Sequence, residues 1–194
     1  ARRSFAIAAA FGMASILSVL VLGDESGYET GEVQKVKLAA IEAEWNTEPA
    51  PASFTLFGIP NQEEMRTDYA IKIPYALGII ATRSLDGQVT GLKDLKSEHE
   101  VRVRSGMTAY DLLTKLQSGD KSDETRARFD EVKQDLGYGL LLKRYTANVT
   151  DATDDQIKAA VDDSIPQVLP LFFAFRIMVA CGMLMLVLIG LAFY

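Results

Sequence analysis

The sequence contains one cysteine, one histidine and one tryptophan among 194 residues. The single cysteine, Cys181, excludes an internal disulfide framework, a C-x-x-C-H haem attachment and a cysteine-rich metal site within this chain. The single histidine, His99, excludes a multi-histidine metal site, and its place on an apolar helical stripe favours a packed side chain over a ligand. A formal net charge of −6 argues against nucleic-acid binding.

Charged residues are also missing from both ends of the chain. Residues 4–23 contain none, and residues 165–194 contain only Arg176, so all 26 acidic residues lie between these runs. A helix needs about 20 apolar residues to cross the hydrocarbon core of a bilayer, so we expect transmembrane helices at 4–23 and 165–194. A signal peptide is the alternative for the first run. Its hydrophobic region is usually only ~7–15 residues long, and no small-x-small site precedes Asp24.

The orientation follows from Arg2 and Arg3 before the first run and the acidic residues after it. Loops rich in lysine and arginine stay in the cytoplasm. We therefore expect residues 1–3 to be cytoplasmic and residues 24–164 to form an external loop between two membrane spans. The expected fold is mostly α: two transmembrane helices joined by a largely helical extracytoplasmic loop. Because the chain begins at Ala1 and stops with the second helix, we expect a fragment of a larger integral membrane helix bundle.

Local patterns predict the first half of the loop. Residues 31–45 contain good helix formers and are followed by two prolines, which predicts a helix. Residues 54–57 are short, apolar and extended. Residues 69–81 form the most hydrophobic part of the loop, but Pro74 and Gly78 break them and they are too short to span. This segment could lie on the membrane surface.

The second half of the loop has clearer helical signals. Apolar residues recur at intervals of three or four over residues 92–116, which predicts an amphipathic helix. Another helix is expected around Phe129, Val132 and Leu136. Thr153 and Gln156 have the spacing of a capping box and predict the start of a last short helix.

Arg176 is the most informative residue of the second apolar run, because an arginine at the centre of a spanning helix costs on the order of 2.5–3.5 kcal/mol. Two interpretations stay open. The side chain could reach the outer lipid headgroups, or it could face the bundle and oppose a carboxylate such as a haem propionate. Met178 and Met185 share one helical face, and each is either ordinary packing or a thioether ligand. Spacing cannot choose between them.

Lys37 and Glu42 lie five residues apart on the expected helix that follows the first span. This spacing places them about 140° apart around an ideal helix. They should therefore not form an ordinary ion pair, and taken alone they are solvated charges.

Six strings, in order along the chain, resemble subunit I of bacterial cytochrome bd ubiquinol oxidases. They are GDESGYE (23–29), QKVKLAAIE (34–42), FTLFGIP (54–60), IPYALGIIATR (73–83), GYGLLLKRY (137–145) and FAFRIMVACG (173–182). The resemblance covers nearly the whole chain and is least distinctive at about residues 85–134, whose presence resembles the long-loop subfamily. It identifies the chain as similar to the quinol loop with the transmembrane helix on either side.

The resemblance implies part of a terminal respiratory oxidase, a multi-pass protein of the bacterial inner membrane in which the loop at residues 24–164 is periplasmic. Such an enzyme oxidises ubiquinol at the periplasmic side and passes electrons through haems to reduce oxygen to water, contributing to the proton gradient. In that family the pattern at residues 34–42 supplies a lysine and a glutamate for quinol oxidation, which fall on Lys37 and Glu42. The methionine two residues after the transmembrane arginine ligates the low-spin haem b, which falls on Met178. Arg176 would then sit beside that haem and favour its reduced state.

The resemblance also implies groups and partners outside this chain. The high-spin haem b, haem d, the histidine opposite Met178 and the oxygen-reducing site belong to the remainder of subunit I. Implied partners are that remainder, subunit II, membrane lipid and quinol. The alternative is a two-span membrane sensor with an external ligand-binding domain. Such a sensor would continue into a cytoplasmic output module and would have no need of Arg176.

Overall fold

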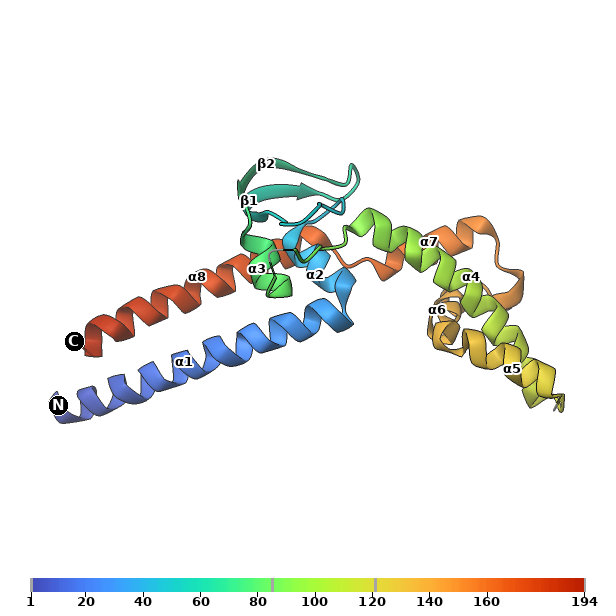
Figure 1. Ribbon diagram of the computed structural model, residues 1–194, viewed down its shortest axis with the longest axis horizontal. Helices are drawn as coiled ribbons and strands as arrows, with labels where there is room; N and C mark the ends of the chain where they lie inside the picture. Colours follow the sequence, from blue (N-terminus) through green and yellow to red (C-terminus); the bar gives the residue numbers. More distant parts are fainter. Residues whose placement is uncertain (1, 85, 121, 194) are drawn as a thin grey trace. The chain divides into compact units, whose positions relative to one another are not determined.

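A computed structural model describes residues 2–84, 86–120 and 122–193. The chain divides into two compact units, one formed by Ala1–Leu92 and Pro166–Tyr194 and the other by Lys93–Ile165. The helices of the described residues are α1 (Arg2–Val33), α2 (Lys35–Glu42), α3 (Ala76–Thr82), α4 (Leu92–Gln117), α5 (Asp123–Val132), α6 (Leu136–Leu140), α7 (Asp154–Ser164) and α8 (Val168–Phe193) (Figure 1). Strands β1 (Phe54–Asn61) and β2 (Arg66–Ile73) form an antiparallel hairpin. Three short 3-10 turns are found at Lys133–Asp135, Leu141–Arg144 and Val149–Asp151.

The first unit contains two helices, α1 and α8, that are long and apolar enough to cross a membrane. They lie side by side and antiparallel, so the two chain termini are at the same end of this unit (Figure 1). Gly12 lies close to α8, because a Cβ there would be 3.2 Å from Ile189 Cδ1. Elsewhere both helices expose large apolar side chains, including Phe11 at 74% and Leu191 at 71%. Surfaces of this kind are rare on soluble monomers and fit a membrane helix-bundle fragment, as expected from the sequence.

The first membrane helix continues well beyond the apolar run, because α1 does not end at Gly23. Arg83, the residue that follows α3, contacts this extension. Its Nη2 lies 2.9 Å from Oδ2 of Asp24 and 2.7 Å from Oε2 of Glu25. Its guanidinium carbon also lies 4.5 Å from the ring centroid of Tyr28. The start of the loop is therefore a rigid helical continuation of the first span.

The expectation of one helix over residues 31–45 is wrong. Gln34 has φ −128° and ψ 59°, which interrupts the helix and separates α1 from α2. This break allows α2 to turn its small side chains inward, and Ala39 and Ala40 are completely buried. Burial of that alanine face outweighs the helix propensity of the continuous segment, which is a weak preference.

The apolar stretch at residues 69–81 also differs from the expectation. Its first part completes β2, the chain turns at Pro74, and its second part forms α3. Gly78 lies inside α3 and does not break it, while β1 is longer than the extended segment expected at 54–57. Tyr69 is 83% exposed on the hairpin, and a position on the membrane surface stays a prediction.

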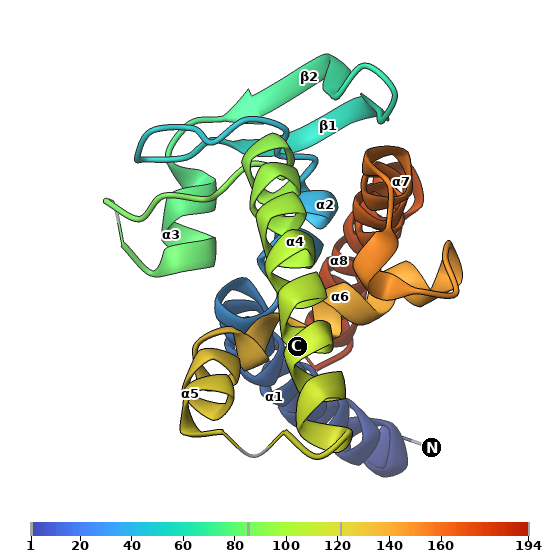
Figure 2. The same ribbon diagram turned by 90° about the vertical axis from the view of Figure 1, so that its right-hand side faces the viewer.

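The second unit is helical (Figure 2), but the helix expected around Phe129, Val132 and Leu136 is divided into α5 and α6 by a 3-10 turn. The amphipathic helix expected at residues 92–116 is α4. The capping box is confirmed at the start of α7, where Gln156 N donates to Thr153 Oγ1 and Thr153 N donates to Gln156 Oε1. A cluster of buried residues forms the core of this unit: Val103, Leu142, Val149, Ile157, Ala160 and Val161.

Two glycines allow α4 and α6 to approach closely in this unit. A Cβ at Gly106 would lie 2.3 Å from the carbonyl oxygen of Asp135 and 2.3 Å from Gly139 N. Any larger residue at either position would therefore force the backbones apart. Gly137, by contrast, has open space around it.

Candidate functional site

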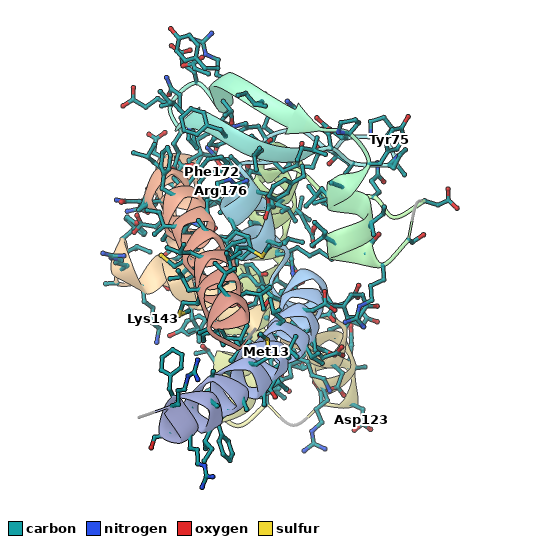
Figure 3. The ribbon with its side chains drawn as sticks, turned by 90° about the vertical axis from the view of Figure 1, so that its left-hand side faces the viewer. Met13, Tyr75, Asp123, Lys143, Phe172 and Arg176 are labelled. Carbon is teal, nitrogen blue, oxygen red and sulfur yellow. The ribbon has the colours of Figure 1, made fainter. Side chains whose placement is uncertain are left out.

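Arg176 extends from α8 toward the loop of the first unit, beside Phe172 (Figure 3). Each of its three side-chain nitrogens has two acceptors. Nε donates to the carbonyl oxygens of Thr55 (3.1 Å) and Leu56 (3.2 Å), Nη1 to those of Ile41 (2.8 Å) and Phe172 (3.2 Å), and Nη2 to Oε2 of Glu42 (3.0 Å) and the carbonyl oxygen of Thr55. The guanidinium is therefore used fully by this chain's own oxygen atoms.

Two aromatic rings complete the surroundings of the guanidinium. Its central carbon lies 3.4 Å from the ring centroid of Phe172 and 5.2 Å from that of Phe54. The Arg176 side chain is only 12% exposed. We call Arg176, Glu42, Phe54, Thr55 and Phe172 the arginine cage. Arg176 thus faces a carboxylate, as one of the two interpretations expected, and in the structure that carboxylate is Glu42.

Glu42 is the last residue of α2, and its side chain is 5% exposed. Burial raises the pKa of its carboxyl above the ordinary value, while the charge and the hydrogen bond of Arg176 offset part of that shift. A buried charge is costly without its partner, so each member of this pair needs the other. The cage fixes the position of one carboxylate at the junction of α2, β1 and α8.

Lys37, the second residue expected to act with Glu42, is exposed on the surface of α2. Glu42 is paired with Arg176 instead, in keeping with the angle expected between Lys37 and Glu42. A hollow of about 170 Å³ lies beside the same helix. Its described lining includes Glu32 and Lys35 but neither Lys37 nor Glu42.

Met178 lies on α8 two residues after Arg176, about 200° around the helix, so it faces away from the arginine cage. Its side chain is 61% exposed, compared with 51% for Met185. A thioether is a known axial ligand of haem iron. Exposure leaves the sulfur of Met178 accessible to a group held by further helices, so the residue fits that role. Met185 is similarly exposed, and this chain alone does not distinguish the two.

Sequence reasoning missed a second buried carboxyl, Glu44, which is 4% exposed. Its pKa is raised to about 7, first by burial and then by the charge of Glu48; Lys72 opposes this shift and Glu42 adds to it. The signal was present in the string Glu42-Ala43-Glu44-Trp45, where two acidic residues alternate with residues that are usually buried.

His99 is a packed histidine, as expected. Its Nδ1 lies 2.8 Å from Oγ of Ser164, and its ring centroid lies 5.1 Å from that of Tyr138. Burial lowers the pKa of the imidazole. No group of three or more His, Cys, Asp or Glu side chains that could hold a metal ion occurs in the described part of the chain.

Comparison with known proteins gives one consistent result. The family model described as cytochrome bd terminal oxidase subunit I matches residues 1–194. The chain is 47% identical over 186 residues to cytochrome bd-II ubiquinol oxidase subunit 1 of Escherichia coli K12, covering 96% of this chain and 36% of that protein. It is 32% identical over 99 residues to cytochrome bd ubiquinol oxidase subunit 1 of Bacillus subtilis 168, covering 51% of this chain and 21% of that protein.

The chain thus spans about a third of its E. coli relative. The match over its full length disfavours the alternative of a two-span sensor, which the sequence had left open. The two apolar antiparallel helices agree with the family's place in the bacterial inner membrane. The chain belongs to the family of subunit I of the cytochrome bd terminal oxidases.

Proposed function

We propose that this chain supplies the quinol-oxidising region of a cytochrome bd ubiquinol oxidase that reduces oxygen to water. The observation that carries the proposal is the ion pair between Glu42 and Arg176, with 3.0 Å between Oε2 and Nη2. It ties a buried carboxylate on α2 to the helix that also presents Met178. One helix thus fixes the group that handles protons and carries the candidate ligand for an electron acceptor.

Quinol oxidation requires a proton acceptor, because each hydroxyl loses its proton as electrons leave. Glu42 takes this role, since a positioned carboxylate can accept a hydroxyl proton. The raised pKa of Glu42 lies closer to neutral pH than the pKa of an ordinary glutamate. The exposed Lys37 donates a hydrogen bond to the other quinone oxygen. A quinol bound between them would bridge their angular separation on α2.

Met178 holds the low-spin haem b in this proposal. Met178 would hold the haem through its sulfur, and the haem would supply a one-electron acceptor whose potential thioether ligation raises. The charge of Arg176 favours the reduced haem less than an unpaired arginine would, because Glu42 balances it within the arginine cage. The high-spin haem b and haem d belong to the remainder of subunit I, which assembles with subunit II.

The proposed topology places residues 24–164 in the periplasm and residues 1–3 in the cytoplasm. Membrane lipid and the remaining helices of subunit I cover the exposed apolar faces of α1 and α8. Protons lost by the quinol then enter the periplasm, and this release contributes to the proton gradient.

The test is quinol turnover in the assembled oxidase. Lys37→Ala and Glu42→Gln should lower ubiquinol oxidation by about 100-fold or more, as expected for loss of a proton acceptor or its partner. The reduced-minus-oxidised haem spectrum should stay intact. Lys158→Ala, which removes an exposed lysine of α7, is the control. Normal quinol turnover in both site variants would contradict the proposal.

A further inference from the structure

The backbone after α2 directs a second carboxyl into the interior. Ala43 has left-handed dihedral angles, φ 52° and ψ 41°, a conformation that is unfavourable for an alanine. The reversal is closed by Glu44 N, which donates to the carbonyl oxygen of Ala39 over 2.9 Å. Both residues that flank Ala43, Glu42 and Glu44, are 4% exposed. The strained turn thus buries two carboxyls that lie two positions apart in the chain.

These two carboxyls have different electrostatic surroundings. Glu42 has Arg176 as its own partner, whereas the base that acts on Glu44 is Lys72, which is paired with Glu48. Glu44 therefore experiences Glu42 and Glu48 as like charges and Lys72 as its opposite charge. With a pKa of about 7, it gains and loses a proton at neutral pH.

Glu48 and Lys72, whose charges act on Glu44, are themselves partly exposed to solvent. The Glu48 side chain is 30% exposed and that of Lys72 is 42% exposed. Burial alone would raise the pKa of Glu48, but hydrogen bonds from Lys72 and from Ser53, whose Oγ lies 2.7 Å from Oε2, lower it. The lowered pKa of Glu48 keeps its carboxyl ionised at neutral pH, so Glu48 does not hold a proton there.

We propose that Glu44 relays the protons of quinol oxidation from Glu42 to the surface at Glu48 and Lys72. The relay rests on the proposed function. In each step the quinol O–H bond breaks, its proton binds the Glu42 carboxylate, and the electron leaves to the oxidase's haem chain. The Glu42 proton then moves to the Glu44 carboxylate, which restores the Glu42–Arg176 ion pair, and Glu44 releases it to water. Two such steps convert one quinol to quinone with two protons and two electrons.

The first test compares two electron donors in the assembled oxidase. Glu44→Gln should lower ubiquinol oxidation at least about tenfold. It should leave unchanged the oxidation of tetramethyl-p-phenylenediamine, which loses an electron without losing a proton. Glu44→Asp keeps a carboxyl and should restore part of the quinol rate. Glu63→Gln, which removes an exposed carboxylate near the hairpin turn, is the matched control.

The second test reads the pH dependence and does not require any change at Glu44. Because the relay accepts a proton only when ionised, the quinol rate should rise with pH through about 7. Glu48→Gln removes a like charge and should move this rise of the quinol rate to lower pH. Lys72→Met removes an opposite charge and should move it to higher pH. Opposite shifts from two surface positions are not expected of a purely structural Glu44.

The remaining outcomes are also decisive. An unchanged quinol rate in Glu44→Gln, equal loss with both donors, or a rise of the quinol rate with pH that neither surface variant moves would each overturn the relay. A wild-type oxidase that oxidises the diamine but not ubiquinol would instead overturn the proposed function, so the two failures are distinguishable.

Discussion

Nη2 of Arg176 lies 3.0 Å from Oε2 of Glu42, and this contact joins residues separated by 134 positions in the sequence. One partner belongs to a membrane helix and the other to the last turn of α2. Both side chains are almost completely buried. The pair therefore determines where the loop helix sits on the outer part of α8.

Removal of both partners should destabilise the assembled oxidase by less than the sum of the two single removals. Glu42→Ala or Arg176→Met alone leaves an uncompensated buried charge, which costs on the order of 3–5 kcal/mol. The double variant should lose clearly less than the sum of the single losses. Thermal unfolding midpoints of the four proteins measure this coupling. Additive losses would show that the two residues stabilise the protein independently.

The sequence predicted the position of Arg176 but not its partner. A charge inside an apolar run requires compensation on energetic grounds alone, whereas the choice of Glu42 depends on tertiary folding. The hairpin was also only partly predicted. Register shifts between Thr55 and Phe57, and between Phe57 and Ile59, disturb the alternation that identifies strands in a sequence. Helices with strong local signals, such as α4 and the capped α7, were predicted correctly.

Met178 should prove to be a haem ligand, and Met185 should not. Met178→Leu keeps the apolar volume, so packing should change by less than about 1.5 kcal/mol. The low-spin haem should nevertheless become high-spin or labile and lose potential, because thioether ligation raises it. Met185→Leu is the matched control on the same face and should leave the spectrum nearly unchanged. An unaltered low-spin band in Met178→Leu would show that this methionine only packs.

The contact between α4 and α6 should not tolerate a methyl group. Gly106→Ala would place Cβ 2.3 Å from backbone atoms of Asp135 and Gly139, so we expect a destabilisation of about 1–3 kcal/mol or more. Gly137→Ala has open space and should be neutral or slightly stabilising, because alanine favours a helix. Rates of limited proteolysis within residues 93–165 of the oxidase compare the two. Equal rates would mean that the close contact is absent in the assembled enzyme.

The loop should be accessible from outside the cell. Trypsin added to spheroplasts should cleave the chain between Asp24 and Ser164, where exposed basic residues such as Arg126 and Lys158 occur. The same protease added to inverted membrane vesicles should leave this segment intact. Cleavage in inverted vesicles alone would reverse the proposed topology.

The length of α1 has a consequence for the height of the proposed quinol site above the membrane. Its 32 residues extend about 48 Å at 1.5 Å per residue, whereas the hydrocarbon core is about 30 Å thick. The outer part of the helix therefore stands clear of the lipid tails, and only Gln34 separates it from α2. The length of this outer part of α1 thus sets the distance from the bilayer to Glu42. If Glu42 is the proton acceptor that we propose, a quinol from the bilayer would have to reach this level to meet it.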